Sequence, residues 1–241
     1  MQNINNELKV ANEELQQFAH IASHDLQEPL RKLRQFSELL IEDYAPELDE
    51  DARYFIETIR SSAQRMSNLI KETLAYSRSG SGNQKIIRID LSNVLQQLRD
   101  EMDLATKDVN GTFVVEDLPV VLANELGMAQ LFRNLMTNGL KYSKPGKPAI
   151  INISVGHGAD EPENLLLIRV SDNGIGIPKK HLQRIFLPYE RLNGSDVAGT
   201  GLGLAICKKV CESHGWTLEV SSEPAVGTTF LIGIPMSSVV V

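Results

Sequence analysis

Apolar residues recur at alternating steps of four and three along the first forty residues of the chain. The series starts with Ile4 and Leu8 and passes through Leu15 and Phe18 to reach Leu40. This spacing puts one apolar stripe along a helix, where a second helix can pack against it. The pattern therefore predicts a long amphipathic helix, with a coiled coil that enters from an upstream segment.

A second helical pattern follows a short acidic connection. Residues 42–51 are rich in carboxylates and contain Pro46, and we interpret them as a solvated turn between two helices. The apolar spacing resumes from Phe55 to Leu74, before a Gly/Ser-rich linker at residues 80–86. Two helices with one stripe each cannot enclose a core. An antiparallel hairpin over residues 1–79, paired with a second copy in a four-helix bundle, is therefore predicted, and with it a homodimer.

Residues 87–241 have a different sequence pattern, in which short runs of β-branched residues alternate with helical patterns. Helices kept apart from a mixed or antiparallel sheet give a two-layer α/β sandwich. The predicted strands are residues 86–89, 112–115, 150–155, 165–170, 217–220 and 229–234, and the predicted helices are residues 91–106, 125–142, 179–186 and 202–214.

Composition and charge narrow the range of partners. With 24 basic and 31 acidic residues the formal net charge is −7, which argues against nucleic acid as a partner. We find no apolar run long enough to span a bilayer and no secretory signal at the start, so no membrane span and a cytoplasmic location are expected. Cys207 and Cys211 lack companion metal ligands and are interpreted as packed, reduced thiols.

Three segments of the second half point to a phosphate-bearing ligand. Asp172 closes a predicted strand and is followed by two glycines, at positions where the backbone must turn sharply or approach a ligand. The run Gly199–Leu204 leads directly into a helix, whose first N–H groups form an anion site. Asn134, Asn138, Lys141 and Tyr142 share roughly one helix face, which offers amide oxygens, an ammonium group and an aromatic ring. Together they indicate a magnesium nucleotide.

In these motifs the sequence resembles the sensor histidine kinases of two-component signalling. Residues 134–143 resemble the N box of that family, residues 172–177 and 199–204 its two glycine boxes, residues 186–192 its F box, and residues 227–230 its last glycine segment. The resemblance implies a Bergerat-type ATP-binding fold with ATP and Mg²⁺ as cofactors. It also implies a mobile lid at about residues 178–197.

The resemblance also implies individual roles. Asp172 would accept the adenine amino group, Tyr142 would pack near the base, and Asn138 would bind magnesium. Asn134, Lys141 and Arg191 would serve the phosphates and the metal. The remaining expected nucleotide contacts are Gly174, Gly176, Ile177, Gly199, Thr200, Gly201, Leu202, Gly203, Leu204 and Thr228.

Residues 18–31 resemble the H box of the family. Their sequence resembles the variant of this box in kinases attached to phytochrome-like or similar soluble sensory modules. His24 matches the phosphoacceptor, and Asp25 is the expected partner that orients the ring and takes its proton. Glu28 stands where many relatives carry a Thr or Asn that orients water for dephosphorylation. A carboxylate there predicts a weak phosphatase and a possible pairing with Arg31 or Lys32.

The sequence thus predicts a kinase core that autophosphorylates His24 from Mg-ATP and passes the phosphoryl group to an aspartate of a response-regulator receiver domain. The alternative is a nucleotide-gated dimeric interaction module without phosphotransfer. An upstream sensor module is expected to lie outside this chain. The other histidines, at positions 20, 157, 181 and 214, are interpreted as surface side chains without a catalytic role.

Overall fold

The computed structural model describes residues 2–79, 85–156, 164–192 and 199–240, with the backbone alone for residues 2–20 and 24. The chain divides into two compact units, Met1–Arg78 and Ser79–Val241. Within the described residues, no helix combines the length and the hydropathy that crossing a bilayer requires.

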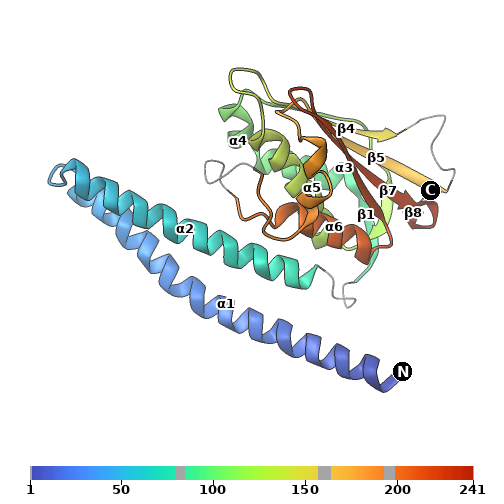
Figure 1. Ribbon diagram of the computed structural model, residues 1–241, viewed down its shortest axis with the longest axis horizontal. Helices are drawn as coiled ribbons and strands as arrows, with labels where there is room; N and C mark the ends of the chain where they lie inside the picture. Colours follow the sequence, from blue (N-terminus) through green and yellow to red (C-terminus); the bar gives the residue numbers. More distant parts are fainter. Residues whose placement is uncertain (1, 80–84, 157–163, 193–198, 241) are drawn as a thin grey trace. The chain divides into compact units, whose positions relative to one another are not determined.

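The first unit is a hairpin of two long helices, α1 (Gln2–Tyr44) and α2 (Glu50–Arg78), which run side by side in opposite directions (Figure 1). Asp49 begins α2, because its Oδ1 accepts a hydrogen bond from the Ala52 N–H at 2.7 Å. Leu30 and Ala63 are buried in this unit. Arg34 donates a hydrogen bond from α1 to the side-chain oxygen of Gln64 on α2. The predicted hairpin is confirmed.

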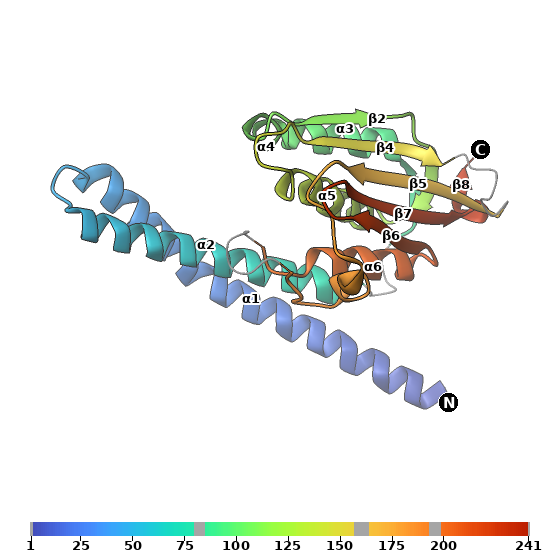
Figure 2. The same cartoon turned by 45° about the horizontal axis from the view of Figure 1, so that its top comes forward.

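The second unit is built on a five-stranded mixed sheet in the order β2-β4-β5-β7-β6. The first pair is parallel and the other three pairs are antiparallel (Figure 2). Its strands are β2 (Thr112–Val115), β4 (Ile150–Gly156), β5 (Leu165–Asp172), β6 (Thr217–Glu223) and β7 (Gly227–Pro235).

Helices cover one face of this sheet, which gives the predicted two-layer sandwich (Figure 1). They are α3 (Leu91–Glu101), α5 (Glu125–Lys141) and α6 (Gly203–Ser213), and a short α4 (Asp103–Asp108) follows α3. Ile153, Val170 and Phe230 stand opposite one another on β4, β5 and β7 and are all buried. Because side chains alternate along a strand, this register turns one apolar face toward the buried Phe132 and Ile206 of the helices.

A smaller antiparallel sheet, β1-β3-β8, completes the unit. It consists of β1 (Ile87–Asp90), β3 (Val120–Ala123) and β8 (Val239–Val240), and a 3-10 turn at Met236–Ser238 precedes β8. All six predicted strands form, whereas β3 and β8 were not predicted. The two-residue β8 has no periodicity of its own, since only its pairing with β3 makes it a strand.

Two helical patterns differ from the prediction in detail. The pattern at residues 91–106 is broken at Met102, whose N–H bonds back to both Leu98 and Arg99 before α4 starts. The pattern at residues 179–186 forms two 3-10 turns, Lys179–His181 and Arg184–Phe186. Cys207 and Cys211 are both buried on α6, as predicted.

Candidate functional site

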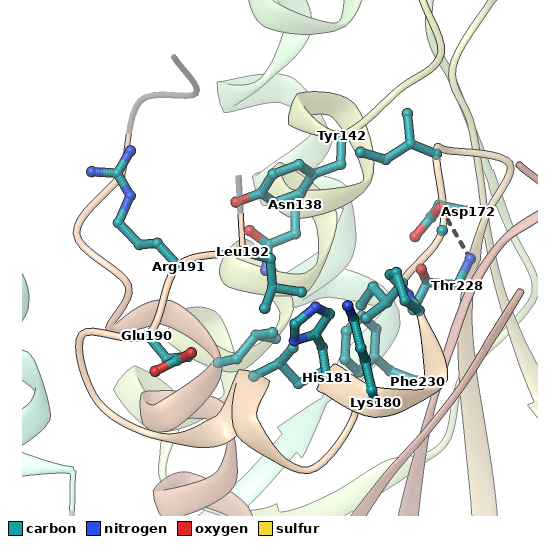
Figure 3. A pocket seen from close by; sticks show the side chains of 16 residues that line it. Asn138, Tyr142, Asp172, Lys180, His181, Glu190, Arg191, Leu192, Thr228 and Phe230 are labelled. Carbon is teal, nitrogen blue, oxygen red and sulfur yellow. Dashed lines mark hydrogen bonds between the residues drawn. The ribbon is translucent and has the colours of Figure 1, made fainter. Parts of the chain in front are cut away.

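A cavity of about 290 Å³ lies in the second unit, between α5, the segment that follows β5, and β7 (Figure 3). Its walls combine apolar side chains, such as Ile185 and Phe230, with polar and charged ones, such as Asn138 and Asp172. This composition is typical of small-molecule sites. Of the residues expected from the sequence, it is lined by Asn138, Tyr142, Asp172, Gly176, Ile177, Arg191, Leu204 and Thr228.

Asp172, the last residue of β5, places a carboxylate in the cavity wall. Its Oδ1 accepts hydrogen bonds from the N–H groups of Gly174, at 2.8 Å, and Thr228, at 3.2 Å (Figure 3). Burial raises the pKa of this carboxyl group, while the two N–H donors and Lys144 act in the opposite direction. The arrangement fixes one oxygen on the protein and suits the group to accept a hydrogen bond from an N–H of a ligand.

Two glycines let the backbone pack tightly around Asp172. A Cβ on Gly227 would collide with the backbone oxygen of Asp172, and a Cβ on Gly176 would collide with that of Glu223. Gly176 also has a φ of +71°, which L side chains rarely adopt. These residues therefore bring the ends of β5, β6 and β7 and the segment after β5 close enough to form one wall.

The polar face of α5 is divided between the cavity and the second glycine segment. Asn138 and Tyr142 line the cavity. The Nζ of Lys141 lies 4.7 Å from the centre of the Tyr142 ring. A Cβ on Gly199 would lie 2.5 Å from the same Lys141 Nζ. The side chain of Asn134 donates a hydrogen bond to the Gly203 carbonyl at 3.0 Å. The four residues thus share a face, as predicted, but Asn134 and Lys141 contact residues 199–203 and are not among those lining the cavity.

The first turn of α6, which begins within the second glycine segment, carries backbone N–H donors. Thr200 Oγ1 accepts a hydrogen bond from the Leu202 N–H at 3.2 Å, and Leu202 makes no side-chain cap to the helix. Gly201, with a φ of +80°, packs against the backbone of Tyr189 and accepts its N–H at 3.0 Å. This hydrogen bond joins Tyr189, in the expected lid, to the second glycine segment, while residues 193–198 lie outside the described ones.

The cavity is also lined by residues that were not among the expected site residues: Ile175, Pro178, Lys180, His181, Ile185, Glu190, Leu192 and Phe230. Lys180 and His181 belong to the first 3-10 turn, and Arg184 pairs with Glu190 at 2.6 Å. Their sequence signal was weak, since a three-residue turn has no periodicity. The surface interpretation of His181 is wrong, because its Nδ1 is buried.

The interpretation of His214 as a plain surface residue is also wrong. Its Nε2 accepts a hydrogen bond from the Asn124 N–H at 3.0 Å, and its Nδ1 lies 2.7 Å from the Val210 carbonyl oxygen. The ring therefore ties the C-terminal end of α6 to the N-cap of α5. His157 and the side chain of His20 lie outside the described residues.

In the first unit, His24 belongs to α1, and its side chain lies outside the described ones. Asp25 and Glu28, on the same helix, are exposed. Glu28 Oε1 pairs with Lys32 Nζ at 2.9 Å, one of the two pairings that the sequence suggested. Both side chains are more than half exposed, so this ion pair contributes little to stability.

Two protein families match the chain in succession. Residues 14–82 match the His Kinase A (phospho-acceptor) domain, and residues 123–238 match the histidine kinase-, DNA gyrase B-, and HSP90-like ATPase domain. This order of domains defines a histidine kinase core. The chain belongs to the sensor histidine kinases.

Curated relatives match almost the whole chain. The phytochrome-like protein Cph1 of Synechocystis is 34% identical over 96% of this chain and 30% of its own length. Cyanobacterial phytochrome A of Nostoc is 35% identical over 95% of this chain and 30% of its own length. The sensor protein kinase WalK of Staphylococcus aureus is 30% identical over 92% of this chain and 37% of its own length. The chain thus spans about a third of the length of these relatives.

Solved structures show the same fold. Full-length ShkA in complex with AMPPNP superposes with a TM-score of 0.68 at 23% identity, over 91% of this chain and 45% of that one. The catalytic domain of the histidine kinase ThkA superposes with a TM-score of 0.53 at 21% identity, over 63% of this chain and 96% of that one. The expected α-helical hairpin followed by an α/β sandwich is confirmed.

Proposed function

We propose that this chain binds Mg-ATP in the cavity of the second unit and transfers the γ-phosphoryl group to His24. The observation that carries the proposal is the Asp172 carboxylate, held by Gly174 and Thr228 in a cavity that combines apolar and polar walls. The chain also carries a phosphoacceptor domain. The nucleotide analogue bound to ShkA supports the choice of ligand.

In this proposal the ligand lies along the cavity with its base at Asp172. The carboxylate accepts a hydrogen bond from the adenine amino group, and the Tyr142 ring packs near the base. Lys141, Arg191 and the first N–H groups of α6 neutralise phosphate charge. Asn134 contributes by fixing the start of α6, as its hydrogen bond to Gly203 suggests.

The residues fit a magnesium ion that is shared with the substrate. In the part of the chain that the structure describes there is no cluster of three or more His, Cys, Asp or Glu side chains that could hold a metal by itself. Mg²⁺ commonly takes one or two protein oxygens and completes its shell with phosphates and water. We assign the protein oxygen to the side-chain amide of Asn138, which lines the cavity.

The transfer step needs little covalent chemistry from the ATP-binding domain. A ring nitrogen of His24 attacks the γ-phosphorus, the bond from that phosphorus to the bridging oxygen breaks, and ADP leaves with the electron pair. Asp25 takes the ring proton. Positioning and charge neutralisation therefore supply most of the catalysis.

The helical hairpin exposes the surface that a homodimer would bury. Leu26, Leu33 and Leu40 on α1 are 43–55% exposed, and Ile59 and Met66 on α2 are 47–48% exposed. Leucines seven residues apart share one helix face, so the exposed residues form stripes. A second copy of the chain would cover these stripes in a four-helix bundle.

Three further parts of the proposal rest on family membership. Residues 1–79 serve as the dimerisation and phosphotransfer domain, 80–86 as the linker and 87–241 as the catalytic domain. The phosphoryl group passes from His24 to an aspartate of a response-regulator receiver domain. The reaction takes place in the cytoplasm, under the control of a sensor module.

The test is incubation with γ-³²P-ATP and Mg²⁺, followed by treatment of the labelled protein with acid and base. We expect acid-labile, base-stable label that is lost in His24→Gln. His20→Gln, which changes the histidine one turn earlier, is the matched control and should keep the label. Binding of ATP without any label would favour the nucleotide-gated interaction module, and label retained in His24→Gln would remove His24 as the acceptor.

A further inference from the structure

His181 gives the cavity a polar atom that the protein does not pair. Its Nδ1 is buried and has no hydrogen-bond partner. Among the described side chains one other buried polar atom shares this state, Trp216 Nε1, and Trp216 is not one of the residues that line the cavity. Buried polar groups in native proteins are nearly always paired, so an orphan in a binding cavity indicates a bound partner.

The position of His181 is fixed by its surroundings. Its own N–H bonds to the Pro178 carbonyl at 2.9 Å, which closes the 3-10 turn. The residue before this proline, Ile177, donates its N–H to Ser222 Oγ on β6 at 2.8 Å. The next turn is anchored by the buried Ile185. The backbone that carries the imidazole is therefore anchored to the sheet, as the support of a preorganised contact should be.

The location of the ring matches the middle of an elongated ligand. In the view of Figure 3, the His181 side chain lies below Tyr142 and Asn138, at a horizontal position between Asp172 on the right and Arg191 on the left. If Asp172 binds the base and Arg191 serves the phosphates, as proposed above, the part of a nucleotide between them is the sugar.

The hydrogen-bonding roles point to the same group. A neutral imidazole has one donor and one acceptor nitrogen, and a buried N–H without a partner is rarer than an unpaired acceptor. The expected state of Nδ1 is thus an acceptor that awaits a donor. Adenosine offers donors at the amino group, which Asp172 takes in the proposed binding mode, and at the ribose hydroxyls.

We propose that His181 positions the bound nucleotide by accepting, at Nδ1, a hydrogen bond from a ribose hydroxyl group. The inference rests on the proposed function, since it requires a nucleotide in this cavity. It assigns a role to a residue of the first 3-10 turn and predicts that the site distinguishes ribose from deoxyribose.

The experiment is calorimetric titration of the full chain with ADP, 2′-deoxy-ADP and 3′-deoxy-ADP in the presence of Mg²⁺, because ADP is not turned over. We expect the wild type to bind ADP about 5- to 10-fold more tightly than one of the two deoxy analogues, as the loss of one hydrogen bond predicts. The analogue that binds more weakly identifies the hydroxyl. In His181→Leu this preference should disappear.

His181→Asn is the conservative control, since its side-chain oxygen can replace Nδ1 as an acceptor, and it should keep part of the preference. A His181→Leu variant that loses the same factor for all three nucleotides would show a merely structural role and overturn the proposal. Wild-type protein that binds all three equally would also overturn it. Failure of the wild type to bind ADP or ATP at all would instead contradict the proposed function.

A measurement on the wild type covers the case in which His181→Leu does not fold. Imidazole ¹⁵N chemical shifts report whether a ring nitrogen accepts a hydrogen bond. Addition of ADP should move the Nδ1 resonance of His181, and the analogue that lacks the relevant hydroxyl should leave it near its unbound position. Equal shifts with all three nucleotides would contradict the proposal.

Discussion

The side chain of Asn134, in the middle of α5, donates a hydrogen bond to the carbonyl oxygen of Gly203, the first residue of α6. A Cβ on Gly203 would contact the Asn134 side chain at 3.6 to 3.8 Å, so the two helices approach closely at this point. The helix that presents Asn138 to the cavity is thus joined directly to the one that carries the second glycine segment.

Asn134→Ala should lower the free energy of unfolding by about 1 kcal/mol, the usual contribution of one hydrogen bond, and weaken ADP binding. The reason is that the start of α6 would lose its anchor on α5. Thr137→Ala is the control, because the Thr137 hydroxyl is exposed and bonds only to carbonyls of its own helix. Urea unfolding and calorimetry measure both effects. Equal losses in the two variants would contradict the role of Asn134.

Gly176 and Gly146 allow a matched test of close packing, because their φ angles are +71° and +73°. Gly146→Ala should lower the free energy of unfolding by about 1 kcal/mol. Its Cβ would have no neighbour within 4 Å, so the left-handed backbone conformation is the only source of strain. Gly176→Ala should cost more than about 3 kcal/mol, because its Cβ also meets the Glu223 backbone. Similar losses of stability in thermal unfolding would show that the packing around Gly176 is looser than described.

Asp172→Asn should abolish ADP binding while the fold is retained. An asparagine oxygen can still accept the N–H groups of Gly174 and Thr228, but its NH₂ group would face the amino group of the base. His24→Gln should leave ADP binding unchanged. Calorimetry compares the two variants, and comparable affinities would remove Asp172 from the binding site.

The same substitution should change how stability depends on pH. Burial raises the pKa of Asp172, so the folded protein binds this proton more readily than the unfolded chain. Its contribution to stability is therefore greatest at low pH and is lost as the pH rises through the raised pKa. The stability of Asp172→Asn relative to wild type should increase as the pH rises above about 4, the ordinary pKa of an aspartate. A difference that stays constant in urea unfolding over this range would refute the buried carboxylate.

Leu33→Asp combined with Ile59→Asp should convert the dimer to a monomer. Both side chains are about half exposed in the single chain. Burying a leucine-sized side chain contributes about 1.5 to 3 kcal/mol, and each change counts twice in a symmetric pair. Leu104→Asp, which changes a 78% exposed leucine of the other unit, should keep the dimer mass in light scattering. A dimer that survives the double substitution would argue against the four-helix bundle.

Most of the fold could be predicted from local patterns. The stripes of α1 and α2, the strand that ends at Asp172 and the apolar helix that starts at Gly203 have periods of 3.6 or 2, which are properties of neighbouring residues. Glycines before a helix and a carboxylate at a strand end are local as well. For this reason the nucleotide motifs were recognised without a structure.

Local patterns in the sequence were enough to predict the helices and strands with a clear period, and the residues that bring charge, amide groups and glycine to the site. Which of these elements and side chains contact one another depends on the three-dimensional packing. It placed Asn134 and Lys141 against residues 199–203, paired β8 with β3, and buried Nδ1 of His181 in the cavity wall. Burial and long-range pairing depend on residues that are distant in the sequence, so no local period reveals them.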